Sequence, residues 1–161
     1  MPSLRKATKE DLDQLTGLLR LLFAIEDDFF FDAVKQRRGL RLMLENRQGC
    51  VLIAEDKTKV VGMCTGQMVI STAEGGPSVL VEDMVIDPAV QGRGLGRALL
   101  EAMLQWAGQQ GATRLQLLAD RNNQAALDFY AHLGWRSTSL ICLRHMLPVE
   151  QPDTSPPFER L

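Results

Sequence analysis

Residues 91–97 could do chemistry, because glycines alternate with other residues where a helix is predicted to begin: Gln-Gly-Arg-Gly-Leu-Gly-Arg. Glycine lets successive backbone N–H groups converge on one point, and the N–H groups of a first helical turn have no intrahelical partner. The helix dipole, Arg93 and Arg97 add positive charge there. The segment therefore predicts an anion site that suits a pyrophosphate. A glycine-rich turn that binds nothing is the alternative.

Two other phosphate-binding loops do not fit this segment. A P-loop needs Gly-Lys-Ser or Gly-Lys-Thr, which does not follow the glycines here. The dinucleotide fingerprint needs Gly-x-Gly-x-x-Gly early in a βαβ unit, whereas these glycines are Gly92, Gly94 and Gly96.

Glu82 and Asp83 are two carboxylates within an otherwise apolar strand, predicted over residues 79–86. Side chains alternate along a strand, so Glu82 is expected on the same face as Met84 and Asp83 on the other. Desolvation in a cleft makes a carboxylate more basic, which suits a general base. Either residue could instead pair with a cation or cap a backbone group. We expect Glu82 to be the base and Asp83 to bind the substrate.

The elements that must position these groups alternate between strands and helices. Strands are predicted over residues 3–7, 50–55, 60–70, 79–86 and 113–119, and a final hairpin over 135–147. Helices are predicted over 9–25, 32–46 and 122–133, and a further helix is opened by the glycine-rich stretch 91–96 and runs to about residue 110. This order predicts a mixed α/β sheet with helices packed on it. We expect a single domain over residues 1–147 and a proline-rich, disordered tail over 148–161.

Composition narrows the class of protein. The 161 residues are 45% hydrophobic, enough for a core, and 18 Lys and Arg against 20 Asp and Glu give a net charge of −2. A general nucleic-acid or membrane-surface binder usually has a basic excess, so neither partner is expected. Cys50, Cys64 and Cys142 lack metal-ligand spacing, so no metal is expected and each should be a core residue. No signal peptide or spanning segment is recognised, and a cytoplasmic location is expected.

Two spaced motifs resemble the GNAT superfamily of N-acetyltransferases. Residues 91–96 match the family's Gln/Arg-x-x-Gly-x-Gly/Ala loop. Residues 123–130, Asn-Gln-Ala-Ala-Leu-Asp-Phe-Tyr, resemble its Asn-x-x-Ala-x-x-x-Tyr helix, which Gly134-Trp135 ends. The resemblance implies an α/β fold with a mixed, mostly antiparallel central sheet, splayed at the cofactor cleft and flanked by about four helices. It also implies acetyl-CoA as co-substrate and direct transfer to a primary amine of a small molecule or peptide in a ternary complex.

The same resemblance implies roles for individual residues. Pantetheine would lie between the strands at 79–86 and 113–119, and the Met84 N–H would polarise the thioester carbonyl. Tyr130 would protonate the leaving thiolate, unless it only packs in the core. Asn123 would hydrogen-bond the cofactor arm. The expected cofactor-binding residues are Met84, Val85, Ile86, Gln91, Gly92, Arg93, Gly94, Leu95, Gly96, Arg97, Asn123 and Tyr130.

Other features of the resemblance leave alternatives open. Some family members carry their acidic base two residues earlier, where this chain has Leu80, so a water chain could replace Glu82. Residues 25–32 mix acids with phenylalanines, which suits a cationic amine, and we expect Glu26 and Asp27 to bind it. A solvated helix end with core phenylalanines is the alternative there. A non-catalytic acyl-CoA sensor and an interaction protein are rival functions, and a homodimer is left open.

Overall fold

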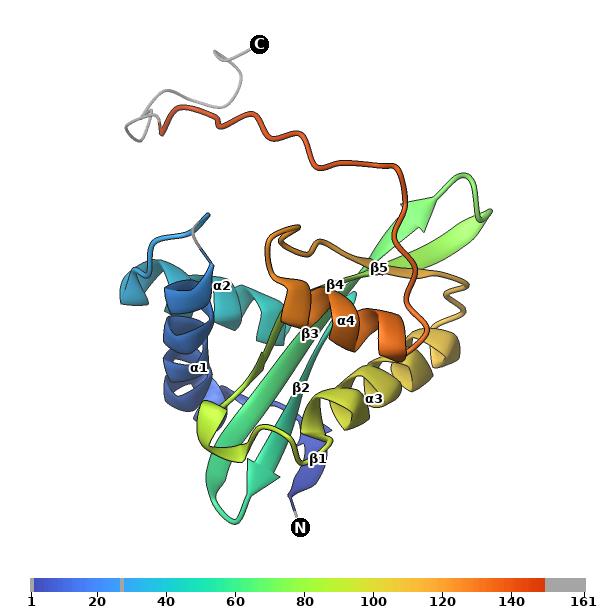
Figure 1. Ribbon diagram of the computed structural model, residues 1–161. Helices are drawn as coiled ribbons and strands as arrows, with labels where there is room; N and C mark the ends of the chain where they lie inside the picture. The colour runs from blue at the N-terminus through green and yellow to red at the C-terminus, as the bar shows by residue number, and fades with distance from the viewer. Residues whose placement is uncertain (1, 27, 150–161) are drawn as a thin grey trace.

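The computed structural model describes residues 2–26 and 28–149 (Figure 1). In chain order the elements are β1 (Ser3–Lys6), α1 (Leu12–Ile25), α2 (Ala33–Glu45), β2 (Gly49–Asp56), β3 (Lys59–Ser71), β4 (Gly76–Ile86), α3 (Leu95–Gln109), β5 (Leu115–Leu117) and α4 (Gln124–His132). Short 3₁₀ turns at Lys9–Asp11 and Pro88–Val90 precede α1 and α3.

The five strands form one sheet in the order β1-β2-β3-β4-β5. The pairs β1/β2, β2/β3 and β3/β4 are antiparallel, and β5 runs parallel to β4. Helices cover both faces, α1 and α2 on one and α3 and α4 on the other (Figure 1). In β2, Val51 and Ile53 pack toward α1 and α2, while Cys50, Leu52 and Ala54 pack toward α3 and α4. A strand with apolar side chains on both faces is expected where helices cover both sides of a sheet.

Local capping explains where two of the helices begin. The side chain of Asp32 accepts hydrogen bonds from the N–H groups of Val34 and Lys35, at 3.1 and 3.2 Å, and so caps α2. The Thr8 N–H donates to Asp11 Oδ2 at 2.7 Å at the turn that opens α1. In both places an aspartate carboxylate accepts hydrogen bonds from backbone N–H groups that have no partner within the helix. The predicted helices at 9–25 and 32–46 are confirmed.

The end of the chain differs from the sequence prediction. The predicted hairpin over residues 135–147 is wrong, because residues 136–149 run as extended chain without a strand, and every one of them is exposed. The residues between 136 and 147 favour strands but include no Gly, Pro, Asn or Asp to make a tight turn. Cys142 lies in this segment and is exposed, against the expectation of a core residue, whereas Cys50 and Cys64 are buried. Most of the predicted tail, residues 150–161, lies outside the described residues.

Candidate active site

The loop before α3 has the backbone geometry of an anion site. Gly92 has φ of 80° and Gly94, the residue before α3, has φ of 77°. Residues other than glycine rarely adopt these φ angles. Among the described residues, the N–H groups of residues 92–97 have no hydrogen-bond partner. A row of free N–H groups at the positive end of a helix can hold a phosphate or pyrophosphate.

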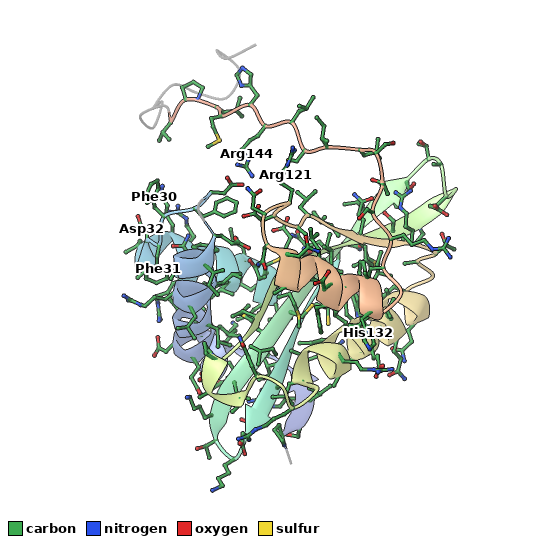
Figure 2. All side chains as sticks on the ribbon, viewed as in Figure 1. Phe30, Phe31, Asp32, Arg121, His132 and Arg144 are labelled. Carbon is green, nitrogen blue, oxygen red and sulfur yellow. The ribbon has the colours of Figure 1, made fainter. Side chains whose placement is uncertain are left out.

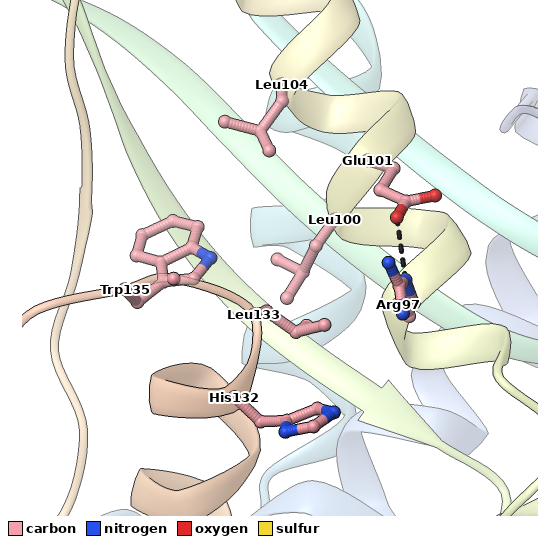
Figure 3. Close-up of a pocket in the computed structure, with 8 residues that line it drawn as sticks. Arg97, Leu100, Glu101, Leu104, His132, Leu133 and Trp135 are labelled. Carbon is pink, nitrogen blue, oxygen red and sulfur yellow. Dashed lines mark hydrogen bonds and ion pairs between the residues drawn. The ribbon is translucent and has the colours of Figure 1, made fainter.

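The two arginines of this loop line different cavities. Arg97 donates to Glu101 Oε1 at 2.8 Å. It borders a cavity of about 340 Å³ between α3 and α4, which is lined by Arg97, Leu100, Glu101, Leu104, His132, Leu133, Gly134 and Trp135 (Figure 3). Arg93 borders a second cavity, of about 370 Å³, together with Leu4 and Leu95. The anion site therefore rests on the backbone N–H groups, while Arg97 is paired with an acid and Arg93 lines a separate cavity.

Next to this loop the sheet opens between β4 and β5. The two strands pair only where residues 79–81 meet Leu115–Leu117. Residues 82–86 of β4 have β3 on one side, and no described strand pairs with them on the other. The sequence predicted a strand at 113–119, so β5 is shorter than expected, and its shortness makes the gap longer.

The register with β3 shows which backbone groups face this gap. The Asp87 N–H donates to the Val61 carbonyl at 2.8 Å. Alternate residues of an antiparallel strand turn their backbone groups to the same neighbour, so those of Val85 face β3. The backbone groups of Met84 and Ile86 then face the gap, where the Gln91 side chain already donates to the Ile86 carbonyl at 3.2 Å.

Gly96 brings three elements of the site together. A Cβ atom at Gly96 would lie 3.1 Å from Cζ of Phe129 and 3.2 Å from Cε of Met84. Only a glycine lets α3, α4 and β4 approach this closely without a shift of these neighbours. The three glycines of the loop therefore serve two purposes, two by their backbone angles and the third by its small size.

Asp83 sits in a β-bulge that the sequence did not predict. Met63 pairs with Val85 and Thr65 pairs with Glu82, so one residue of β3 lies opposite two residues of β4, and β4 carries one extra residue. Asp83 has φ of 49°, unusual for a residue other than glycine. The regular side-chain alternation assumed for Glu82 and Asp83 does not hold through such a bulge.

The environments of the two carboxylates differ. Asp83 is partly buried and its Oδ2 accepts a hydrogen bond from the Thr65 hydroxyl at 3.2 Å. Burial, together with the negative charge of Glu82, raises the pKa of Asp83 to about 6, although the hydrogen bond from Thr65 acts in the opposite direction. Glu82 is exposed. A carboxyl group with a pKa near 6 is one that can take up and release protons at neutral pH.

Glu26, at the end of α1, faces the same region. Burial raises its pKa, and so do the negative charges of Asp83, Asp28, Asp120 and Glu82. These acids come from the loop after α1, from β4 and from the loop after β5, so the fold collects them from three separate places. Asp27, the other residue expected to bind the substrate, lies outside the described residues.

Tyr130 is partly buried in a cluster of aromatic rings on α4 and after it. Its ring lies 5.3 Å from that of Phe129 and 5.9 Å from that of Trp135, both edge to face. Burial and the nearby groups of Cys64 and Glu26 raise the pKa of Tyr130 to about 12. The hydroxyl therefore keeps its proton at neutral pH and can donate it.

Asn123 caps the helix that carries Tyr130. Its Oδ1 accepts a hydrogen bond from the Ala126 N–H at 3.1 Å. The side-chain NH₂ of Asn123 makes no hydrogen bond to the described residues and stays free for a ligand.

Sequence reasoning missed three residues of this region. Thr65 is 1% exposed, and its contact to Asp83 joins residues that the sequence separates by 18 positions. Asp120 precedes α4 in a loop whose course the sequence does not specify. Arg144, which is labelled in Figure 2, lies 3.7 Å from Asp28 and 5.3 Å from the centre of the Phe29 ring. The contacts of Arg144 could not be predicted, because they depend on the course that residues 136–149 take past Asp28 and Phe29.

Comparisons with known proteins agree with this geometry. The model of the acetyltransferase (GNAT) family matches residues 18–135. An uncharacterized N-acetyltransferase of Methanocaldococcus jannaschii is 25% identical over 142 residues, which make up 86% of this chain and 62% of that protein. The chain thus spans less than two thirds of the length of this curated relative.

Two solved structures share the fold. A predicted acetyltransferase from Clostridium acetobutylicum, solved with acetyl-CoA, aligns with a TM-score of 0.74 and 19% identity over 90% of this chain and 96% of that one. AAC(6')-Iy, an aminoglycoside N-acetyltransferase solved with a bisubstrate analogue, aligns with a TM-score of 0.77 and 16% identity over 92% of this chain and 99% of that one. The expected α/β fold with a mixed sheet and four helices is confirmed. No helix within the described residues is long and apolar enough to span a membrane.

Proposed function

Because the chain belongs to the acetyltransferase (GNAT) family, we propose that it transfers an acetyl group from acetyl-CoA to a primary amine. The observation that supports this most strongly is the row of free N–H groups at residues 92–97, beside a gap in the sheet. The first feature suits a pyrophosphate and the second suits an extended chain that carries amides. Coenzyme A contains both, joined end to end.

The residues present fit this cofactor. The N–H groups of residues 92–97 would hold the pyrophosphate, with Arg93 and Arg97 on its flanks. The backbone groups of Met84 and Ile86, which face the gap, would pair with the pantetheine amides as a neighbouring strand does. The free NH₂ of Asn123 would reach the same arm from the start of α4.

Acetyl-CoA supplies a thioester, whose carbonyl carbon the amine nitrogen attacks and whose sulfur leaves with the electrons of the broken carbon–sulfur bond. The N–H of Met84 would donate to the carbonyl oxygen as negative charge grows on it. Tyr130 would donate its phenolic proton to the leaving sulfur. Its raised pKa supports this role, because a phenol that is ionised could not act as the acid.

The general base is the role for which the structure changes our preference. The sequence favoured Glu82, and that prediction stays untested. The bulge, the burial and the raised pKa favour Asp83 as the group that accepts the proton from the amine, directly or through water. Glu82, exposed beside it, would then hold the positively charged amine as it arrives.

The acceptor that suits this site is a small molecule or peptide with more than one positive charge. Besides burial, the negative charges of Asp83, Asp28, Asp120 and Glu82 raise the pKa of Glu26, so these acids act on one region. One ammonium must lose its proton to react, and a second would remain charged and bind among the remaining acids. The aminoglycoside acceptor of the structural neighbour AAC(6')-Iy belongs to such a class.

The test is release of CoA across a panel of amines at low and high salt. We expect kcat/KM to be highest for di- and polyamines or aminoglycosides, lower for monoamines, and lower for all of them at high salt. A matched alcohol should release no CoA. If acetyl-CoA raised the melting temperature but no amine released CoA, the protein would be a non-catalytic acyl-CoA-binding module. If acetyl-CoA left the melting temperature unchanged, the cofactor site itself would be rejected.

A further inference from the structure

Thr65 carries a hydroxyl group in the buried middle of β3, where burial alone does not require one. The residue is 1% exposed, and its neighbour Cys64 is buried completely. Valine has nearly the same shape, favours strands and needs no hydrogen-bond partner in such a place. A buried hydroxyl that lacks a partner is costly. The partner that Thr65 does have therefore indicates what its hydroxyl is for.

That partner is the carboxyl group of Asp83. Thr65 lies opposite Glu82 in the pairing of β3 with β4, and its hydroxyl donates to Oδ2 of the next residue, Asp83, at 3.2 Å. Among residues 2–26 and 28–149, no other hydrogen bond to this carboxyl group is formed. Oδ2 is thus held, and Oδ1 is the oxygen that remains available for a proton.

An aspartate in a bulge needs such a contact to keep one orientation. The last torsion of an aspartate side chain is broad, so the carboxyl group turns easily when nothing restrains it. Asp83 has φ of 49°, and side-chain directions through a bulge do not follow the regular alternation of a strand. Thr65 can restrain this torsion, because its own β-branched side chain is stiff and buried.

The same hydrogen bond acts on the charge of Asp83. Burial and the negative charge of Glu82 raise the pKa of Asp83, whereas the hydroxyl of Thr65 lowers it. Glu26, at the end of α1, is a further acid that interacts with Asp83. Cys64 stays neutral beside them, because burial raises its pKa to about 12. The charges around Asp83 thus oppose its ionised form, and Thr65 supports it.

We propose that Thr65 is a positioning residue, whose hydroxyl holds Oδ2 of Asp83, stabilises the ionised carboxylate and leaves Oδ1 to accept the proton. The inference rests on the proposed function, in which Asp83 takes the proton from the attacking amine. Thr65 itself contacts neither the amine nor acetyl-CoA in this scheme. Its effect is therefore expected in the pH dependence of the reaction and not in cofactor binding.

The substitution Thr65→Val tests this role, because it removes the hydroxyl and keeps the shape. Without this donor, the acid limb of kcat/KM should move up by about one pH unit. With a wild-type pKa of about 6, about half of Asp83 is ionised at pH 6, and in the variant only about a tenth. The variant should therefore be about fivefold slower than the wild type at pH 6 and nearly equal to it at pH 8. The ionisation of the amine cancels in this ratio, since both proteins receive the same amine.

Three further variants separate the hydroxyl from packing. Thr65→Ser keeps the hydroxyl and should behave as the wild type at both pH values, whereas Thr65→Ala lacks it and should repeat the pH pattern of the valine variant. Thr16→Val is the matched control, because Thr16 is also buried and its hydroxyl donates to the Leu12 carbonyl at 2.7 Å. Its ratio to the wild type should be the same at pH 6 and pH 8. A Thr65→Val defect of equal size at both pH values, or a serine variant as impaired as the valine variant, would overturn the proposal.

Carbon NMR of the carboxyl groups tests the same contact without turnover. The signal of Asp83 is the one that Asp83→Asn removes. Its titration midpoint should move up by about one pH unit in Thr65→Val and stay in place in Thr65→Ser and Thr16→Val. A midpoint that Thr65→Val leaves unchanged would overturn the proposal whatever the activity. If no amine releases CoA, the proposed function fails, and this titration still decides whether Thr65 acts on Asp83.

Discussion

The hydroxyl of Thr65 donates a hydrogen bond to Oδ2 of Asp83 over 3.2 Å, from a side chain that is itself 1% exposed. This contact crosses from β3 to the bulge in β4 and fixes a carboxyl group at a backbone angle that few residues adopt. It leaves the pKa of Asp83 at about 6, because burial and the charge of Glu82 outweigh the hydrogen bond. The bulge thus places a carboxyl group of neutral-range pKa in the open part of the sheet.

The stability of the fold should depend on pH through Asp83. Its pKa in the folded chain is about 6, above the ordinary value of 3.8, so between these values the folded state holds a proton that the unfolded state has lost. The free energy of unfolding should therefore fall as pH rises from about 4 to about 6, by up to about 3 kcal/mol. Urea unfolding of the wild type and of Asp83→Asn across this range measures it.

Asp83→Asn is the matched variant for that measurement, because asparagine tolerates a positive φ and can still accept from Thr65. The difference between the two proteins isolates Asp83 from Glu26, whose pKa is also raised. Parallel curves for the two proteins would show that Asp83 titrates in the ordinary range.

Turnover should separate Asp83 from Glu82. We expect Asp83→Asn to lower kcat at least about tenfold with acetyl-CoA affinity unchanged, since an amide cannot take up a proton. Glu82→Gln should chiefly raise the KM for the amine, and kcat/KM of the wild type should rise with pH through about 6. If Glu82→Gln lost kcat and Asp83→Asn lost only affinity, the base would be Glu82, and no effect of either would leave water.

Tyr130→Phe removes one hydroxyl and keeps the ring that packs on Phe129 and Trp135. As the general acid, Tyr130 should contribute on the order of 10²–10⁴ to kcat. Calorimetric titration should give the same acetyl-CoA affinity for both proteins, because the N–H groups of residues 92–97 are unchanged. A variant with full activity would assign Tyr130 to packing alone.

Gly94→Asp should weaken acetyl-CoA binding strongly, because it puts a negative charge beside the N–H groups that would hold the pyrophosphate. Gly75→Asp is its control: Gly75 has φ of 70°, Gly94 has φ of 77°, and a Cβ at either meets nothing within 4 Å. The two variants share strain and charge but only one lies at the loop. At a hundredfold excess, acetyl-CoA should stabilise the control by about 2.7 kcal/mol and the loop variant by much less. Equal stabilisation of both would remove the pyrophosphate from this loop.

Much of this architecture could be predicted from local patterns. Apolar spacing defines α1 and α3, and the glycines with their neighbouring arginines define the loop at residues 91–97. The bulge at Asp83 could not be predicted, because no residue type there requires it and it arises from pairing with β3. The short length of β5 also depends on its neighbours, since it pairs with β4 only where Leu115–Leu117 meet residues 79–81.

Residues 136–149 illustrate a different limit of sequence reasoning. Leu140, Ile141 and Leu143 have strong strand preference, and that preference is real in the sequence. Whether they form a strand depends on an edge to pair with and a turn to reach it, and residues 136–147 offer no turn. Propensity therefore predicted the extended backbone correctly and the hairpin wrongly.

The gap between β4 and β5 also bears on how long the protein survives in a cell. If acetyl-CoA occupies it, a metabolite completes a sheet that the polypeptide leaves unfinished, and local opening of residues 82–86 becomes rarer as that metabolite becomes abundant. Proteases act on such open forms in proportion to their population. The abundance of the protein would then follow the acetyl-CoA supply without any change in its synthesis, which pulse-chase labelling under carbon starvation can measure.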